Sequence, residues 1–291
     1  MERELWAVIS ESLKRLPRRR LRNAVYHNAE ILAVLLWAAL HDRPISWACK
    51  RSSWPVQAWK RRLPDQSTVS RRLRHPSLSE DLGWVLARVQ SRLPAGRVLL
   101  TDGKAYPLEQ RTGDRQARVG RGPGRYAPGY KLHVLVDEQQ RLEGWEVEPM
   151  NTAETTVCKR LVSALGPQRR GRLLVGDAGY DSNPLHEITR ENNLRLLAPR
   201  RRPGTGLGER RHHRDRLASK RLTEERGGWM WEMLKTMRWG VERFFAGLAS
   251  SAVNAGHLPM WVRGLTRVRL WIGAKLTVNA ARLVRNERIR A

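Results

Sequence analysis

The first third of the chain carries apolar residues at helical spacing. Residues 27–41 and 79–92 each repeat apolar side chains every three or four positions, which predicts two buried helices. Between them, the turn and cap residues Pro64-Asp65 precede a short amphipathic stretch, which predicts a capped helix over 64–75. Pro94-Ala95-Gly96 then interrupts the helical pattern, so we place a domain boundary at this point.

Beyond this boundary the pattern changes to short apolar runs bounded by glycine, proline or aspartate, which predict strands. Residues 109–128 are rich in glycine and arginine without apolar periodicity, so we expect a loop there. The expected strands are 98–102, 129–137, 142–147, 173–177 and 194–198, and the expected helices are 153–165, 184–190, 229–249 and 257–286.

This order of elements predicts an α/β fold with a mixed five-stranded sheet and flanking helices, the ribonuclease-H-like arrangement. An all-helical region precedes the sheet. We therefore expect two domains: a helical DNA-binding region over 1–95, and a ribonuclease-H-like catalytic domain over 96–291 that includes the C-terminal helices.

Two of the predicted strands end in a carboxylate. Asp102 follows the apolar run Val98–Leu100, and Asp177 follows Leu173–Val175 in the same way. Carboxylates at the carboxyl ends of buried strands lie at the rim of an α/β sheet, where such sheets place their sites. Glu242 lies on the predicted helix 229–249, and with the two aspartates it raises the possibility of three carboxylates around divalent metal.

Phosphodiester cleavage is one reaction that such a centre could catalyse. Two divalent ions about 4 Å apart can activate a nucleophile and stabilise the leaving oxygen, and Mg²⁺ prefers a few carboxylates and several waters. Structural alternatives exist for each residue: the aspartates could be loop caps, and Glu242 could pair with Arg238 one helical turn earlier.

The charge of the chain points to a polyanionic partner. The formal net charge is +27, from 55 Lys and Arg against 28 Asp and Glu, which favours nucleic acid. Two cysteines without metal-ligand spacing exclude a disulfide framework or zinc site. The longest apolar run, 31–40, is too short to span a membrane, and the N-terminus lacks the pattern of a signal peptide. We therefore expect a cytoplasmic protein with no membrane partner.

Basic residues on predicted elements are candidate DNA contacts. Arg71, Arg72 and Arg74 lie mostly outside the apolar face of the helix over 64–75, as in a recognition helix, although an ordinary surface helix would show the same pattern. Lys131 and His133 share one face of a predicted strand and could approach a substrate, or could be surface positions.

Several blocks of this sequence resemble the catalytic blocks of DDE transposases from bacterial insertion sequences, of the IS-four and IS-five type. They are Asp102-Gly103, the block Asp177–Ser182, and Arg238 followed by Glu242-Arg243-Phe244. The N-terminal stretch PDQSTVSRRL also resembles the segment before the catalytic domain in that family, and the resemblance extends over about residues 25–285.

The resemblance implies a ribonuclease-H-like catalytic domain that cleaves and joins DNA strands with Mg²⁺, or Mn²⁺ as a substitute, and with two ions. It makes Asp102, Asp177 and Glu242 the catalytic metal ligands and Arg238 and Arg243 DNA contacts. It further implies double-stranded DNA partners (the terminal inverted repeats and the target), a homodimer on DNA, and association with the bacterial nucleoid.

The chain departs from this family pattern at two positions. Lys235 and Ala249 stand where many relatives of the IS-four type carry tyrosine and lysine. Two alternatives stay open: an inactive or domesticated DNA-binding protein, and a metal-dependent nuclease of the same fold. An RNA-binding protein would explain the charge but not the carboxylates. Asp181 is expected to cap the following helix rather than to act as a fourth ligand.

Overall fold

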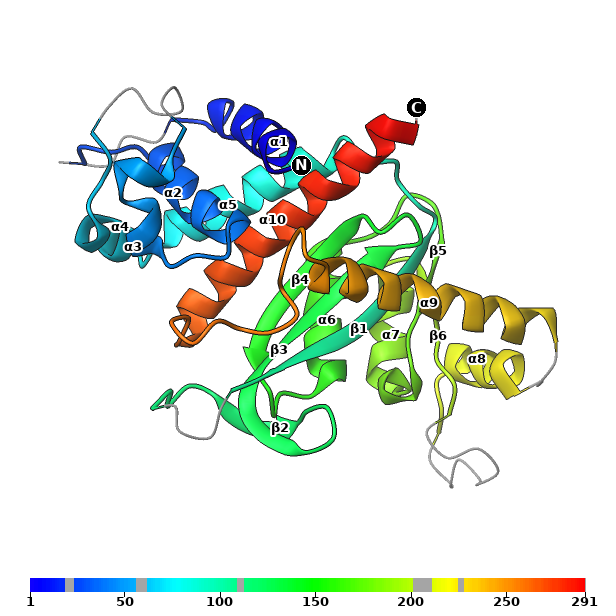
Figure 1. Ribbon diagram of the computed structural model, residues 1–291. Helices are drawn as coiled ribbons and strands as arrows, with labels where there is room; N and C mark the ends of the chain where they lie inside the picture. Colours follow the sequence, from blue (N-terminus) through cyan, green and yellow to red (C-terminus); the bar gives the residue numbers. More distant parts are fainter. Residues whose placement is uncertain (19–23, 56–61, 109–112, 201–210, 225–227, 291) are drawn as a thin grey trace. The chain divides into compact units, whose positions relative to one another are not determined.

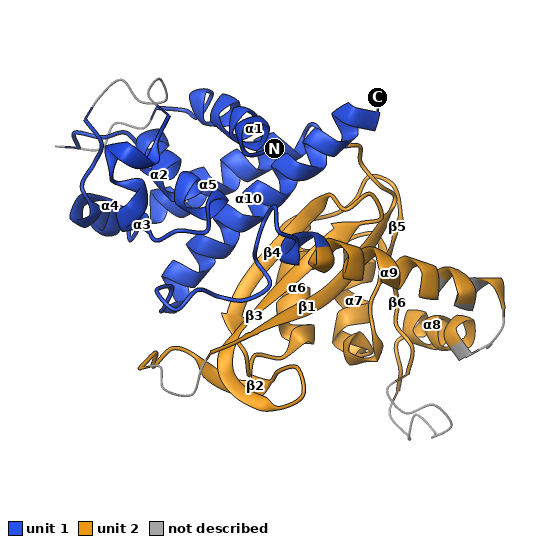
Figure 2. Ribbon diagram, viewed as in Figure 1, with its two compact units in different colours: residues 1–93, 247–291 blue, residues 94–246 orange. Residues whose placement is uncertain are grey.

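The chain forms two compact units (Figure 2). The computed structural model describes residues 1–18, 24–55, 62–108, 113–200, 211–224 and 228–290. One unit comprises residues 1–93 and 247–291, and the other comprises 94–246. The division between residues 93 and 94 falls at the Pro94-Ala95-Gly96 break. The C-terminal residues 247–291 belong to the unit of the N-terminal helices, whereas the sequence grouped them with the sheet.

The first unit is helical in its described part. Helix α2 is apolar on all sides, and it is buried because α1, α3, α5 and α10 pack around it. Asp65 caps α4 as predicted, with its carboxylate accepting a hydrogen bond from the Thr68 amide at 2.8 Å. The elements are α1 (Glu2–Lys14), α2 (Asn28–Leu40), α3 (Ile45–Ala48), η1 (Arg51–Ser53), α4 (Gln66–Arg72), α5 (Pro76–Gln90) and α10 (Leu265–Arg290).

Three tryptophans form part of the core of this unit. The ring of Trp37 stacks on Trp54 with centroids 4.8 Å apart, and Trp6 meets Trp37 edge-on at 4.9 Å. Large aromatic bodies such as these contribute much apolar burial. Among the described residues, none of the helices is long and apolar enough to cross a membrane.

The second unit is built on a six-stranded sheet (Figure 1). β1 pairs antiparallel with β3 on one side and parallel with β5 on the other, and β5 pairs parallel with β6. The far edge of β3 is covered by β4 and β2. The strands are β1 (Val98–Pro107), β2 (Arg118–Arg121), β3 (Tyr126–Asp137), β4 (Leu142–Pro149), β5 (Arg172–Val175) and β6 (Leu194–Leu197).

Strand β2 corrects the expectation of a loop over 109–128. Its sequence, RVGR, is largely exposed and has no apolar face to bury, so periodicity could not reveal it. Backbone pairing with residues Tyr126–Gly129 of β3 makes it a strand. Residues 109–112 lie outside the described part, as do residues 201–210 of the second basic stretch.

Helices cover both faces of this sheet (Figure 1). On one face, α6 and α7 enclose a core that includes Leu99, Leu135 and Leu161. On the other face lies α9, where a Cβ added to Gly240 would come within 2.5 Å of Leu100 Cδ1. The helical elements of the unit are α6 (Glu154–Leu165), η2 (Ala178–Tyr180), α7 (Asn183–Glu191), α8 (Arg214–Glu224) and α9 (Trp229–Ala249), the last ending just beyond the unit.

The turn between β3 and β4 fixes where β1 begins. Asp137 is fully buried, and its carboxylate accepts hydrogen bonds from the amides of Gly96 at 2.7 Å and Arg141 at 2.9 Å. Glu138 accepts the Val98 amide at 2.8 Å. These bonds satisfy backbone donors that would otherwise be buried without partners, and they hold the strand that carries Asp102 in place.

Candidate active site

Asp102 lies in the middle of β1 and is mostly buried. Its Oδ1 accepts a hydrogen bond from the Gly103 amide at 2.7 Å. Burial raises the pKa of Asp102 to about 6 against the effect of this hydrogen bond, and the carboxylates of Asp177 and Glu154 raise it further, while Arg238 opposes the shift. Three carboxylates are therefore close enough to repel one another, with Arg238 beside them.

Asp177 lies two residues beyond the end of β5, after Gly176. Because β5 runs parallel to β1, with Val175 opposite Leu100, Asp177 and Asp102 each follow this pair by two residues. Strand β1 does not end at Asp102, as the sequence predicted, but continues to Pro107 through its pairing with β3. Asp177 caps η2, and its Oδ1 accepts the Gly179 amide at 2.7 Å. The two aspartates chosen from their strand ends thus lie near each other.

Glu154 is the site residue that sequence reasoning missed. It is the first residue of α6, where the positive end of the helix dipole favours an anion. Its Oε1 lies 2.8 Å from Lys131 Nζ. It follows no predicted strand directly, so the strand-end rule did not select it. The available signal was an acidic first residue on the helix after the β3–β4 hairpin.

Glu242 stands apart from this group in its burial. It is exposed on α9, one helical turn beyond Arg238. Among the residues that the structure describes, no three aspartate, glutamate, histidine or cysteine side chains are grouped as ligands of one metal ion. Asp177 and Glu154 lie within electrostatic reach of Asp102, but within the described ranges neither these three nor a set that includes Glu242 forms such a group.

The rim nevertheless has the chemistry of a divalent cation site. Asp102 and Asp177 supply hard oxygen donors, which Mg²⁺ and Mn²⁺ prefer. Burial is the largest cause of the raised pKa of Asp102, and repulsion from the carboxylates of Asp177 and Glu154 adds to it. A divalent ion would remove that repulsion, so the residues present fit the metal.

Residues 94–278, more than half of the chain, match a family model described as "Transposase DDE domain". The chain belongs to the DDE transposase family. A solved structure of the piggyBac transposase synaptic complex with hairpin DNA has a similar fold, with a TM-score of 0.52 and 11% sequence identity. The match covers 99% of this chain and 73% of that one. No curated protein matches the sequence significantly.

Asp181, in the same block of the transposase as Asp177, does not cap α7 as expected. The N-cap of α7 is Ser182, and no side chain caps the helix. Asp181 instead binds Arg216 with both oxygens, at 2.7 and 2.8 Å. Burial opposes the ionised form, but His186 and Arg216 lower the pKa of Asp181 to about 2. Its charge is balanced within the protein, so it is not a fourth ligand.

The arginines of α4 differ in what they contact. Arg71 and Arg74 are exposed. Arg72 is half-buried, and its guanidinium donates to the Tyr26 carbonyl at 2.8 Å and to the Asn28 side chain. This arginine is used inside the helical unit, so only Arg71 and Arg74 of the three present their side chains to solvent.

The basic residues of the second unit also differ in how far they are buried. Arg238 and Arg243 are exposed on α9, and Lys131 keeps 13% of its side chain exposed. His133, on the same face of β3 as Lys131, is 1% exposed. Burial lowers its pKa to about 4. His133 is therefore a neutral interior residue, and it does not reach a substrate as Lys131 can.

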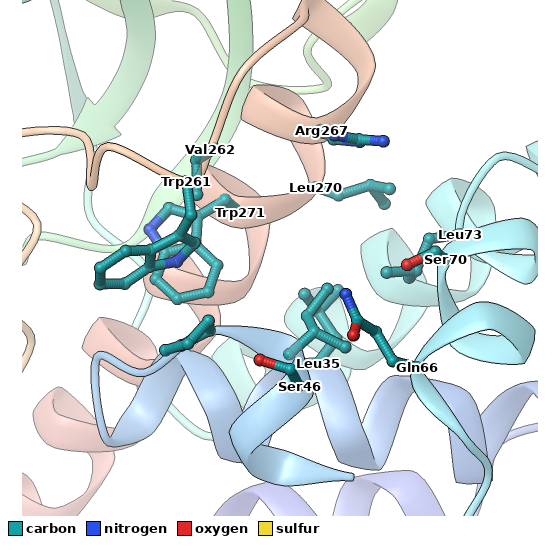
Figure 3. Close-up of a pocket in the computed structure, with 12 residues that line it drawn as sticks. Leu35, Ser46, Gln66, Ser70, Leu73, Trp261, Val262, Arg267, Leu270 and Trp271 are labelled. Atoms are coloured by element: carbon teal, nitrogen blue, oxygen red, sulfur yellow. The ribbon is translucent and has the colours of Figure 1, made fainter.

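A pocket of about 190 Å³ in the helical unit lies between α4, α10 and the segment before α10 (Figure 3). Trp261, Trp271 and Leu35 line it, and Gln66 and Ser70 of α4 contribute polar groups. Arg267 is the charged residue among the described lining residues, and none of these is acidic. This pocket is therefore no candidate for the metal.

Proposed function

We propose that this DDE transposase binds double-stranded DNA at the terminal inverted repeats of its element and catalyses metal-dependent strand cleavage and strand transfer. One observation carries the proposal: Asp102 and Asp177 lie together at the rim of the sheet, with the pKa of Asp102 raised, in a chain of net charge +27. Acidic residues in a basic protein suit a metal that acts on a polyanion.

The side chains at the rim have distinct tasks in this proposal. Asp102 and Asp177 would hold Mg²⁺, with Mn²⁺ as a substitute and two ions in all, and the Gly103 and Gly179 amides orient their carboxylates. The ions would supply activation of water or of a DNA 3′-hydroxyl and stabilisation of the leaving oxygen. Resemblance to the family supports Glu242 as the further ligand.

Exposed basic and aromatic side chains support DNA as the substrate. On α9, Arg238 and Arg243 are exposed, and Trp239 keeps 63% of its surface exposed between them. Arginine binds phosphate, and a tryptophan can stack on an unpaired base. Arg71 and Arg74 would contact the element ends. Pairing two ends calls for a homodimer on DNA, in a cytoplasmic protein that is associated with the nucleoid when bound.

The test uses a plasmid that carries the DNA segments flanking the coding sequence of this chain. We expect Mg²⁺-dependent cuts at defined positions in these segments and none in a plasmid without them. Asp102→Asn should abolish cleavage while leaving the affinity for the flanking DNA, measured by gel shift, unchanged. Undiminished cleavage by this variant would contradict the proposed mechanism.

A metal-dependent nuclease of the same fold is the alternative that an assay can separate directly. Pre-cut ends with free 3′-hydroxyls, incubated with the protein, Mg²⁺ and a target plasmid, should become joined to the target. Cutting without joining would favour the nuclease. Specific binding without cutting or joining would favour an inactive DNA-binding protein.

A further inference from the structure

We propose that Lys131 and Glu154 form a working pair in the active site, in which Glu154 positions the Lys131 ammonium against a phosphate of the DNA. The inference rests on the proposed function, because it assigns a role within that site. Glu154 is then a positioning residue, and Lys131 is the group that touches the substrate.

The first observation is the path of the Lys131 side chain. Lys131 lies on β3 opposite Ala105 of β1, and its side chain extends to Gly103, the residue after Asp102. A Cβ at Gly103 would lie 2.9 Å from Lys131 Cδ, which is closer than real contacts of this kind. The glycine therefore leaves the space that the lysine needs to reach the rim.

The second observation is where Glu154 places its two oxygens. Its Oε1 would lie 3.2 Å from a Cβ at Gly103, and its Oε2 would lie 3.2 Å from a Cβ at Gly179. Gly103 follows Asp102, and Gly179 lies two residues beyond Asp177. The carboxylate thus lies beside the backbone of both aspartate motifs, and in each motif a glycine makes room for it.

The third observation is the ion pair between Lys131 and Glu154 and the N–H donors of Lys131 that it leaves unused. Lys131 Nζ donates to Glu154 Oε1 at 2.8 Å, with 13% and 27% of the two side chains exposed. Within the described part of the chain this is the one acceptor of the ammonium, which has three N–H groups. Two donors remain for the oxygens of a phosphate that approaches Asp102.

A second ion pair offers a matched control. Arg160 of α6 binds Glu146 and Glu148 of β4 at 3.0 and 2.9 Å. Like the Lys131–Glu154 pair, it links α6 to the sheet. It involves none of the groups that shift the pKa of Asp102. Glu146→Gln therefore removes one carboxylate of an α6-to-sheet ion pair outside that group, and Glu148 still binds Arg160.

The experiment compares wild type with K131M, E154Q, E154D, the double variant K131M/E154Q and the control E146Q. Single-turnover cleavage of the flanking DNA is measured at saturating protein. Loss of a positioned donor at a reacting phosphate slows the chemical step about 100-fold, and loss of its orienting partner about 10-fold or more. We expect the double variant to be no slower than K131M, E154D to recover part of the rate, and E146Q to match wild type.

Two readouts that do not involve turnover accompany the rates. The slope of log affinity for DNA against log salt should fall by about 1 in K131M. Mn²⁺ affinity, measured by calorimetry without DNA, should stay within about threefold of wild type in K131M and E154Q, since neither residue is assigned to the metal. A tenfold loss of Mn²⁺ affinity in E154Q alone would overturn the positioning role.

The design separates failure of this inference from failure of the proposed function. If Asp102→Asn abolishes cleavage while K131M and E154Q cleave like E146Q, the pair has no role in the reaction and the function stands. Multiplying losses in the double variant would also overturn the pairing. Cleavage by Asp102→Asn at the wild-type rate would overturn the function and this inference with it.

Discussion

Two aspartates of one block, Asp177 and Asp181, are four residues apart and have opposite surroundings. Asp177 lies near Asp102, whose pKa is raised to about 6 by burial and by neighbouring carboxylates. Asp181 is bound through both oxygens by Arg216, and its pKa falls to about 2. At the first site carboxylates repel one another, with Arg238 in opposition, whereas at the second site Arg216 balances the charge of Asp181. A divalent cation would therefore relieve repulsion at the first site only.

The largest difference between the two aspartates should appear in cleavage. Asp177→Asn should slow Mg²⁺-dependent cleavage by at least about 10³-fold, because a metal ion contributes several kcal/mol to such reactions. Asp181→Asn should keep the rate per folded molecule within about tenfold. Rates are measured on the flanking DNA well below the unfolding temperature. Equal losses in both variants would abolish the distinction.

Stabilisation of the fold by metal should depend on Asp102 and not on Asp181. For wild type and Asp181→Asn we expect the unfolding temperature to rise with Mg²⁺ or Mn²⁺, since binding at 100 times the dissociation constant adds about 2.7 kcal/mol. Asp102→Asn should lose this response. Differential scanning calorimetry with and without the ion measures it, and a wild-type protein indifferent to both ions would contradict the metal site.

Arg216→Gln and Asp102→Asn should change the stability of the metal-free protein in opposite directions. Arg216→Gln leaves the buried Asp181 carboxylate without its main partner, so the free energy of unfolding should fall by about 2–3 kcal/mol. Asp102→Asn should raise it by about 1–2 kcal/mol at pH 8, because the raised pKa means that the ionised form of Asp102 destabilises the fold above pH 6. Urea unfolding at pH 8 gives both values, and a loss of stability in Asp102→Asn would contradict the destabilising effect of the buried Asp102 charge.

The smallest expected effect is on the pH dependence of folding. The pKa of Asp181 is below its ordinary value, so its ionisation stabilises the fold above about pH 4, and this contribution is lost as the pH falls towards about 2. Wild type should therefore lose about 1–2 kcal/mol more than Asp181→Asn between pH 5 and pH 2. Parallel curves for the two proteins, from urea unfolding at each pH, would show that the pair has no such role.

Local pattern was sufficient for the parts of the fold that each segment specifies by itself. The apolar runs before Asp102 and Asp177 and the cap at Asp65 follow from the identity of neighbouring residues, and the structure has strands and a helix start at these places. The end of the first strand did not follow, because pairing with β3 carries β1 past Asp102 to Pro107. Strand β2 was not predicted, because it has no apolar face and becomes a strand only through backbone pairing with β3.

The sequence by itself determined that this protein is a basic α/β protein with carboxylates after two apolar strand segments, and its motifs resembled those of DDE transposases. Only the tertiary structure decided which acids meet. Parallel pairing of β1 with β5 brings Asp102 to Asp177, and the start of α6 adds Glu154 with Lys131. Arg216, from 35 residues further along the chain, takes Asp181 out of the site. Electrostatic partners are chosen by distance in space, and a one-dimensional pattern contains no such distances.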